Sequence, residues 1–305
     1  MTPAAVDSNG VRFYSRFCAR GMTTVPEIAY VNGEFLPLER AMIHVEDRGF
    51  QFADSVYEVV RTYHGKPFAV DEHLARLFRS LESIRLPHKF TTSQLHSLIE
   101  EAAKRAAFPE AVIYLQVTRG RAPRHRGFPA KSEPTLVITV RELRSTEHLR
   151  EQGVRVITVP DIRWTRCDIK SVALLANVLA YQAAKDAGAN DALFVESDDT
   201  VNEATAGNVF VVIGGELVTS PKGPEILPGV TREKILQAAR AAGIATREAR
   251  ISKAELYRAE EIFLTSTTSE VVPVVEVDGK KIGPGKPGPI AGRIYEQFVR
   301  MFAGK

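Results

Sequence analysis

The hydrophobic pattern of this chain switches between a period of two and a helical period. Two early stretches read as pairs of short strands, one pair around Asn32-Gly33 and the other around His64-Gly65. Both dipeptides tolerate the positive φ angles of a tight hairpin. From Asp71, a residue type that caps helices, the apolar residues instead fall three and four apart. Strands joined by hairpins and followed by helices predict an α+β fold.

The first half of the chain predicts one small domain. Pro87 ends the helix that starts at Asp71, residues 92–107 predict a second helix, and two strands around a charged loop follow. Residues 143–153 are polar and lack apolar periodicity. Because 305 residues exceed the usual size of one domain, we expect two. The expected division is a small N-terminal domain at 26–143, a linker at 144–147 and a large C-terminal domain at 148–305.

The second half predicts further strands and helices. Residues 153–164 alternate as a strand, and residues 171–188 read as a buried helix that Gly188 closes. Another helix fits residues 231–243, and residues 261–265 read as a strand. Two more hairpin dipeptides are present, Gly214-Gly215 and Asp278-Gly279.

Composition excludes several classes of protein. Forty basic and 37 acidic side chains leave a net charge of +3, so we expect a small-molecule substrate and no nucleic acid. No apolar run approaches the roughly 18–20 residues that span a bilayer, so no membrane partner is expected. The two cysteines, Cys18 and Cys167, form no CxxC, which favours a reducing cytoplasm. The seven histidines show no metal-ligand spacing, so no metal is expected.

Residues 1–25 are expected to form a disordered N-terminal extension. They carry several arginines and little acid, which resembles a transit peptide, but they lack the apolar core of a secretory signal. The extension would precede a second possible start at Met22, and a targeting peptide is the alternative interpretation of this segment.

Lys170 stands beside the apolar run "SVALLANVLA", between a predicted strand and a predicted helix. A buried ammonium without a partner costs several kcal/mol. A buried lysine therefore loses its proton, pairs with an anion, or condenses with an aldehyde. An ordinary exposed lysine at a helix start is the alternative.

Two segments have the chemistry of an anion site. In "ILPGVTREK", Gly229 allows close backbone approach, Thr231 can cap the helix, and the free first-turn amides attract a phosphate. A group of four hydroxyl side chains follows an apolar strand: Thr265, Ser266, Thr267 and Thr268. An ordinary capped helix and a polar turn are the alternatives.

Charged residues supply further candidates. Glu203 is predicted in a loop of small residues between two strands, where its carboxylate can pair with a protonated nitrogen. On the first predicted helix His73, Arg76 and Ser80 share a face, and Arg76 can hold a phosphate with its fork of donors. A basic loop suits a carboxylate substrate or an acidic partner: Arg119, Arg121, Arg124, His125 and Arg126. Solvated surface charges remain the alternative for each.

Six motifs occur in an order that resembles the D-amino acid aminotransferases, which are fold-type IV enzymes dependent on pyridoxal 5'-phosphate. They run from "YVNGEFLPLERAMIHVEDRG" through "IYLQVTRG", "CDIKSVALL", "VNEATAGNVF" and "LPGVTRE" to "FLTSTTSEVVPVVEVDG", and the likeness covers residues 30–298. The resemblance implies a small N-terminal α/β domain and a larger C-terminal domain whose β-barrel-like sheet is flanked by helices. It also implies a homodimer whose active sites are shared at the interface.

The resemblance further implies a role for each candidate residue. Lys170 would be the catalytic lysine that binds the cofactor, and Glu203 would pair with the pyridine nitrogen. The other cofactor contacts would be Arg76, Leu227, Val230, Thr231, Ser266 and Thr267. Substrate would be bound by Tyr57, Thr267, Thr268 and, from the neighbouring subunit, Arg124, His125 and Arg126.

Two departures from the family pattern are visible. The carboxylate trap of the family reads Arg-x-His, whereas this chain has Arg124-His125-Arg126, and the extra fixed charge favours dicarboxylates such as 2-oxoglutarate. In addition, Ala53 and Ser55 stand where relatives often carry glycine.

The implied activity is transfer of the amino group of a D-alanine-like donor to a 2-oxo acid, in two half-reactions. Alternatives of the same fold are a branched-chain L-amino acid transaminase, an (R)-amine transaminase and an aminodeoxychorismate-type lyase. A relative that binds the cofactor without catalysis is a further alternative.

Overall fold

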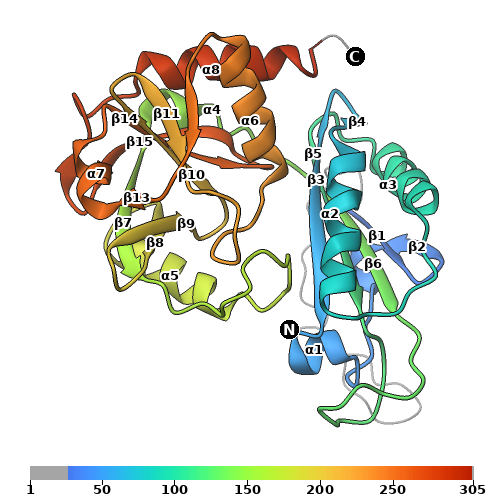
Figure 1. Cartoon of the computed structure of the whole chain (residues 1–305). Coiled ribbons are helices and arrows are strands. Elements are labelled where there is room, and N and C mark those ends of the chain that lie inside the picture. The colour runs from blue at the N-terminus through green and yellow to red at the C-terminus, as the bar shows by residue number, and fades with distance from the viewer. Residues whose placement is uncertain (1–26, 304–305) are drawn as a thin grey trace, which may run out of the picture.

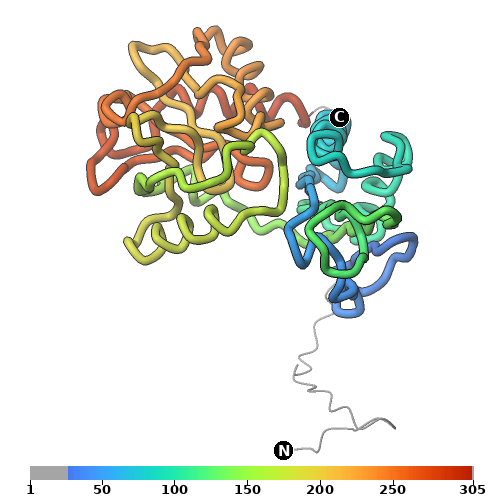
Figure 2. The backbone as a smooth tube through the Cα atoms, turned by 60° about the horizontal axis from the view of Figure 1, so that its bottom comes forward, coloured from blue at the N-terminus to red at the C-terminus, as the bar shows by residue number. Residues whose placement is uncertain are grey.

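The computed structural model describes residues 27–303, and the predicted extension at 1–25 lies outside them. The chain folds around two separate sheets, one built from residues 28–142 and the other from residues 154–281 (Figure 1). In Figure 2 the two appear as distinct lobes. This architecture confirms the predicted two-domain α+β fold, while the linker limits at 144–147 stay a prediction.

The first sheet has the strand order β2-β1-β6-β5-β3-β4, and every neighbouring pair is antiparallel. Its two predicted hairpins are confirmed, because Asn32, Gly33, His64 and Gly65 all have positive φ between paired strands. The strands are β1 (Ile28–Val31), β2 (Glu34–Pro37), β3 (Ser55–Tyr63), β4 (Lys66–Pro67), β5 (Ala111–Thr118) and β6 (Thr135–Glu142). The short helices η1 (Leu38–Arg40) and α1 (Arg48–Phe52) lie between β2 and β3.

Helices α2 (Val70–Ser83) and α3 (Thr92–Ala106) pack on this sheet through one shared apolar core. The predicted α2 is confirmed but its ends differ. Its N-cap is Ala69 rather than Asp71, which lies in the first turn, and it stops at Ser83, before Pro87. A left-handed Arg85 breaks the helical backbone there, so the helix ends before the proline is reached.

The second sheet runs β12-β11-β10-β14-β15-β7-β8-β9-β13, with β16 paired to β15. It curls around an apolar core of valine, leucine, isoleucine and alanine side chains that come mainly from its central strands. Both predicted hairpins are confirmed by positive φ at Gly214-Gly215 and Asp278-Gly279. The strands are β7 (Val154–Pro160), β8 (Asp191–Val195), β9 (Thr200–Ala204), β10 (Asn208–Ile213), β11 (Glu216–Thr219), β12 (Thr246–Glu248), β13 (Ile251–Ser252), β14 (Glu261–Ser266), β15 (Glu270–Val277) and β16 (Lys280–Lys281).

Helices flank this sheet as expected: α4 (Glu147–Gln152), α5 (Leu175–Asp186), α6 (Val230–Ala241), α7 (Lys253–Arg258) and α8 (Pro289–Arg300). Just beyond α8, Phe302 stacks on Tyr63 of β3 with ring centroids 3.7 Å apart, so the C-terminal helix contacts the small domain (Figures 1 and 2). The segment read as a polar linker without periodicity contains the short helix α4.

The predicted burial of α5 is wrong for the single chain. Only Ala180 and Ala184 of this helix are buried, against β8. The large apolar side chains point outward, and Leu175 remains 72% exposed. An apolar run in the sequence does not say which surface packs on it. Within this single chain, no segment covers the outer face of α5. The exposed side chains are Leu175, Val178, Leu179 and Tyr181.

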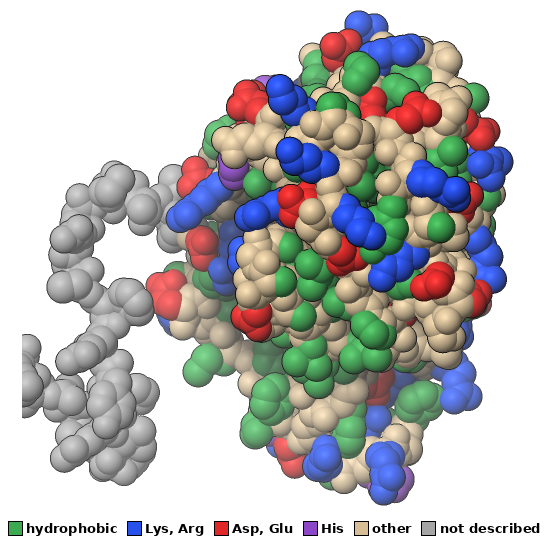
Figure 3. All heavy atoms as spheres, turned by 90° about the vertical axis from the view of Figure 1, so that its left-hand side faces the viewer, with side chains coloured by type: hydrophobic (Ala, Val, Ile, Leu, Met, Phe, Trp, Pro, Cys, Tyr) green, Lys and Arg blue, Asp and Glu red, His purple; other side chains and the backbone are tan. Residues whose placement is uncertain are grey.

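The outer surface carries both signs of charge. On the face drawn in Figure 3, basic and acidic side chains are interspersed with apolar ones rather than gathered by sign. No helix among residues 27–303 is long and apolar enough to cross a membrane.

Ala53 adopts a left-handed backbone conformation, with φ 54° and ψ 25°, at the end of α1. The Cβ atom makes this conformation costly for residues other than glycine, by about 1–2 kcal/mol. Ala53→Gly should therefore raise the free energy of unfolding by about 0.5–1 kcal/mol after the greater freedom of the unfolded glycine chain is subtracted. Urea denaturation of the wild type and the variant measures this difference in the free energy of unfolding. The matched control is Ala41→Gly, where φ is −72° and glycine brings no relief, so stability should fall.

Candidate active site

A cavity of about 250 Å³ lies between the two domains and contains most of the predicted site residues. The small domain contributes β3 and α2, and the large domain contributes the loop before α5, strand β9, the start of α6 and the turn after β14. The candidate residues that line it are Tyr57, Arg76, Lys170, Glu203, Leu227, Val230, Thr231, Ser266, Thr267 and Thr268.

Lys170 is held at this cavity by its backbone. Its carbonyl accepts a hydrogen bond of 3.0 Å from the Tyr57 amide, and its amide donates to Ser80 Oγ at 3.2 Å. Its Nζ lies 4.2 Å from the centre of the Tyr57 ring. Lys170 therefore sits in a loop of the large domain that both hydrogen bonds attach to the small domain. It lies five residues before α5 and not at a helix start.

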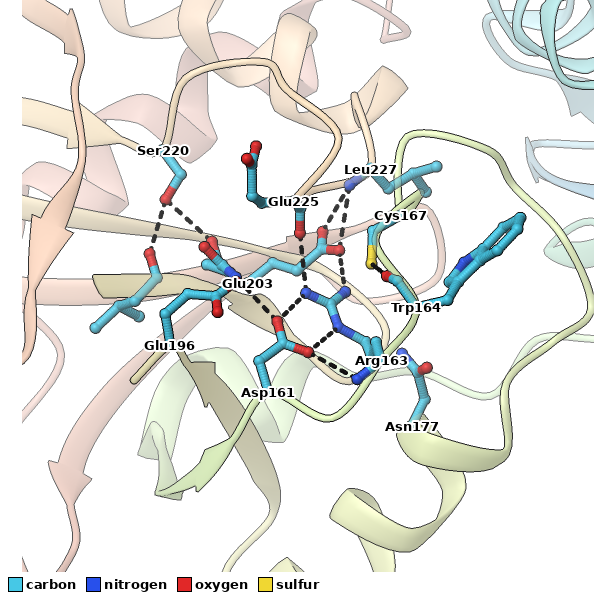
Figure 4. A network of polar contacts seen from close by, with 12 residues as sticks. Asp161, Arg163, Trp164, Cys167, Asn177, Glu196, Glu203, Ser220, Glu225 and Leu227 are labelled. Carbon is cyan, nitrogen blue, oxygen red and sulfur yellow. Dashed lines mark hydrogen bonds and ion pairs between the residues drawn. The ribbon is translucent and has the colours of Figure 1, made fainter. Parts of the chain in front are cut away.

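Glu203 lies at the floor of the cavity and belongs to strand β9, not to the loop that the sequence predicted. Its side chain accepts hydrogen bonds from Arg163 Nη1 at 2.5 Å and from the Leu227 amide at 3.2 Å (Figure 4). It also accepts one from Asn208 Nδ2 at 3.1 Å. Asp161 in turn binds Arg163 through both carboxylate oxygens. The carboxylate is thus fixed from three sides.

Burial raises the pKa of Glu203 to about 7, although the Arg163 guanidinium and the Leu227 amide act in the opposite direction. A buried carboxylate with a raised pKa gains most from a cationic partner, because that partner removes the desolvation penalty. The floor of the cavity is therefore suited to a protonated ring nitrogen.

The start of α6 offers backbone donors to the cavity. Its N-cap is Gly229, and no side chain caps it, so the prediction that Thr231 caps this helix is wrong: Thr231 lies inside the first turn. A Cβ at Gly229 would collide with Asn208 Oδ1, so only glycine fits here. The uncapped amides and the positive end of the helix dipole form an anion site.

Hydroxyl groups face the same end of the cavity. Thr265 and Ser266 belong to β14 and only the next two threonines form the turn. The Oγ1 atom of Thr265 is buried and has no hydrogen-bond partner within residues 27–303. Such an orphaned polar atom beside uncapped helix amides indicates a missing polar ligand.

Arg76 reaches the cavity but its fork of donors is already used. Nε and Nη2 bind the two oxygens of Glu58 at 2.7 and 2.8 Å, and Nη1 donates to the Pro228 carbonyl at 3.0 Å. His73 binds the same carboxylate at 2.8 Å. Burial raises the pKa of Glu58, but Arg76 and His73 outweigh it and leave that pKa well below its usual range. Glu58 therefore fixes Arg76 in place as a charged pair.

The basic loop is not part of this chain's cavity. The residues that line it, among those described, include none of Arg124, His125 and Arg126, and all three are exposed. Arg119 differs from them, because it is 2% exposed and donates to Asp54 at 2.7 Å. The prediction that Arg119 belongs to the exposed basic cluster is therefore wrong.

A second, more open hollow of about 810 Å³ is lined by residues of both α2 and α6 and shares Gly229 and Val230 with the first. Apart from Arg79, its charged side chains are paired with each other: Arg166 with Asp168, Lys222 with Glu233, and Lys234 with Glu72. It holds neither Lys170 nor Glu203 and is not the site.

Two residues of the site, Glu58 and Arg163, were not predicted from the sequence. Glu58 could have been found, because the alternation of β3 places it on the same face as the buried Val56 and Val60. Arg163 follows β7 and meets Glu203 forty residues later in the chain. No local pattern predicts that contact.

Comparison with known proteins identifies the family of this chain. The amino-transferase class IV family matches residues 55–277. The D-alanine aminotransferase of Bacillus licheniformis is 40% identical over 263 residues, covering 86% of this chain and 93% of the relative. That of Staphylococcus haemolyticus is 37% identical over 277 residues, covering 90% and 98%.

Solved structures agree as well. The branched-chain amino acid aminotransferase of Escherichia coli superposes with a TM-score of 0.86 at 27% identity, covering 92% of this chain and 95% of that one. A branched-chain amino acid aminotransferase of T.th., solved with pyridoxamine 5'-phosphate, gives a TM-score of 0.84 at 26% identity, with the same coverage.

The two-domain fold and these comparisons define a fold-type IV enzyme dependent on pyridoxal 5'-phosphate. Within that class, the chain belongs to the class IV aminotransferases. The predictions of an aminotransferase and of this cofactor are confirmed.

Proposed function

We propose that this enzyme transfers the amino group of a D-amino acid such as D-alanine to a 2-oxo acid such as 2-oxoglutarate. The observation that carries the proposal is identity of 37–40% to D-alanine aminotransferases along 86–90% of the chain. The cavity with Lys170 at its wall and Glu203 at its floor supports it.

The cavity fits pyridoxal phosphate at both ends. Uncapped amides of Val230 and Thr231, together with the unpartnered Thr265 hydroxyl, suit the phosphate, and Arg76, Ser266 and Thr267 line the same region. Glu203, which accepts from the Leu227 amide, suits the ring nitrogen. When bound, the cofactor supplies an aldehyde that takes up the amino group and a ring that accepts the electrons released at the α-carbon.

The residues of the chain then divide the work. Lys170 Nζ would remove the α-proton of the amino donor and release a proton again within the same half-reaction, and in the second half-reaction it would place a proton on the α-carbon of the acceptor. It suits this task because it projects from a loop fixed at both of its backbone groups. Glu203 holds the proton of the ring nitrogen. Tyr57, stacked on Tyr114 at 5.4 Å, presents its face to Lys170 and forms the substrate side of the cavity together with Thr267 and Thr268.

We further propose a homodimer that completes each site with Arg124, His125 and Arg126 of the partner. These residues do not line the cavity of their own chain, so a carboxylate bound there needs another source of positive charge. The exposed apolar side chains of α5 support the dimer, as do three others, because water disfavours such surfaces. Those others are Met42, Val45 and Phe50, which are 80%, 67% and 75% exposed.

A reducing cytoplasm is the compartment that we propose. The only two cysteines, Cys18 and Cys167, lie far apart in the sequence and form no CxxC motif, which supports a chain that does not depend on disulfides.

The test separates D from L substrates. D-alanine and L-alanine are each incubated with purified holoenzyme and 2-oxoglutarate, and pyruvate is measured. We expect pyruvate from D-alanine only, at a rate that depends on the acceptor. Turnover of L-alanine alone contradicts the proposal.

A branched-chain L-amino acid transaminase is the second candidate, because the branched-chain enzymes share the fold at TM-scores of 0.82–0.86. Activity on L-leucine that exceeds activity on D-alanine would favour it. An aminodeoxychorismate-type lyase would instead release pyruvate from its own substrate without any acceptor.

A further inference from the structure

A single buried arginine binds the backbone of the loop that carries Arg124 and Arg126, residues 119–134. Arg48, the first residue of α1, is 3% exposed. Its Nη1 donates to the His125 carbonyl at 2.5 Å and to the Gly127 carbonyl at 3.3 Å, and its Nη2 donates to the Arg126 carbonyl at 3.5 Å. One guanidinium therefore binds three consecutive backbone carbonyls directly after Arg124.

The neighbours of Arg48 hold the same loop. Its own amide donates to the Gly120 carbonyl at 3.0 Å. Phe52, at the end of α1, makes cation–π contacts with two guanidinium groups. The centre of its ring lies 4.9 Å from Cζ of Arg48 and 4.7 Å from Cζ of Arg124. Figure 1 shows α1 beside the long loop that joins β5 to β6.

Arg48 is also tied to the strand that lines the cavity. Its Nε donates at 2.8 Å to Asp54 Oδ2, an oxygen that also accepts from Arg119 at 2.7 Å. Asp54 directly precedes β3, which carries Tyr57. The position of the loop and the position of this strand are thus set by one carboxylate.

We propose that Arg48 is a positioning residue for substrate binding: it fixes the backbone of residues 125–127 and thereby the direction in which Arg124 and Arg126 point. The inference rests on the proposed function, in which these two arginines bind substrate carboxylates. Arg48 acts on main-chain oxygens, so its effect does not depend on which side chains the loop carries. Only a guanidinium has enough donors in a fixed plane for this task.

The test is Arg48→Lys, which keeps the charge and the ion pair with Asp54 but cannot reach three carbonyls. We expect KM for D-alanine and for 2-oxoglutarate to rise about tenfold or more, with kcat changed far less, because a displaced trap weakens binding rather than proton transfer. In a background that carries both Arg124→Ala and Arg126→Ala, the same substitution should leave KM unchanged, because both of its targets are already absent.

A second readout needs no activity. Trypsin cleaves after Arg121, Arg124 and Arg126, and nicking of residues 119–134 should be faster in Arg48→Lys than in the wild type. Arg150→Lys is the control, because Arg150 binds Glu270 in the large domain, outside this loop. If wild-type enzyme fails to use D-alanine while the variant is still nicked faster, the loop attachment holds and only the proposed function fails. Wild-type KM and wild-type nicking in Arg48→Lys would overturn the inference.

Discussion

Lys170→Ala should abolish transamination, with a loss of about 10³-fold or more, since a positioned base alone contributes roughly 10²–10⁴-fold. The fold should persist, because the contacts that fix residue 170 come from its backbone: the bonds to the Tyr57 amide and to Ser80 Oγ survive the substitution. Steady-state assays with D-alanine and 2-oxoglutarate measure the loss. Thermal denaturation checks that the protein is intact.

Covalent attachment gives a separate check on Lys170. Reduction with borohydride followed by peptide mapping should place the cofactor on the peptide that contains residue 170 in the wild type, and on no peptide in Lys170→Ala. The control is Lys104→Ala on the exposed side of α3, which should behave as wild type in both assays. Strong residual turnover in the Lys170 variant would refute the assigned role.

The local parts of the structure could be predicted from the sequence. The hairpins at Asn32-Gly33 and Gly214-Gly215 follow from residues that accept positive φ, and α2 follows from the spacing of its leucines. Both signals depend on neighbours in the chain. The same reasoning predicted an anion site at the start of α6. It assigned Thr231 as the N-cap wrongly, because in the sequence a threonine in the first helical turn cannot be told from a threonine at the N-cap position.

The contacts between distant segments could not be predicted. Pairing of Arg163 with Glu203 depends on the curl of the second sheet, which brings the end of β7 to β9. The two hydrogen bonds from the Arg76 guanidinium to the Glu58 carboxylate depend on the way in which α2 packs on β3. The burial of α5 was misjudged for a related reason, because composition does not say which surface covers a helix. The individual roles of the site residues remain predictions.

Glu203→Gln should lower kcat by roughly 10²–10³-fold, because the ring nitrogen of the cofactor would lose the charge that keeps it protonated. The amide also introduces a donor where Arg163, Asn208 and the Leu227 amide already donate, so one of these contacts must break. Single-turnover conversion by D-alanine, followed by absorbance, measures the effect. The matched control is Glu196→Gln, whose carboxylate accepts from Asn202 next to the same network but outside the cavity.

The same variant has a pH signature in the cofactor-free protein. Because burial raises the pKa of Glu203 from 4.5 to about 7, the folded chain binds this proton more tightly than the unfolded chain does. Glu203 thus contributes stability that is fully present below pH 4.5 and is lost as the pH rises through about 7. Glu203→Gln should remove that part of the slope, which urea denaturation between these pH values measures. A variant with the wild-type slope and wild-type kcat would show that another group sits against the ring nitrogen, because both effects derive from one buried carboxyl.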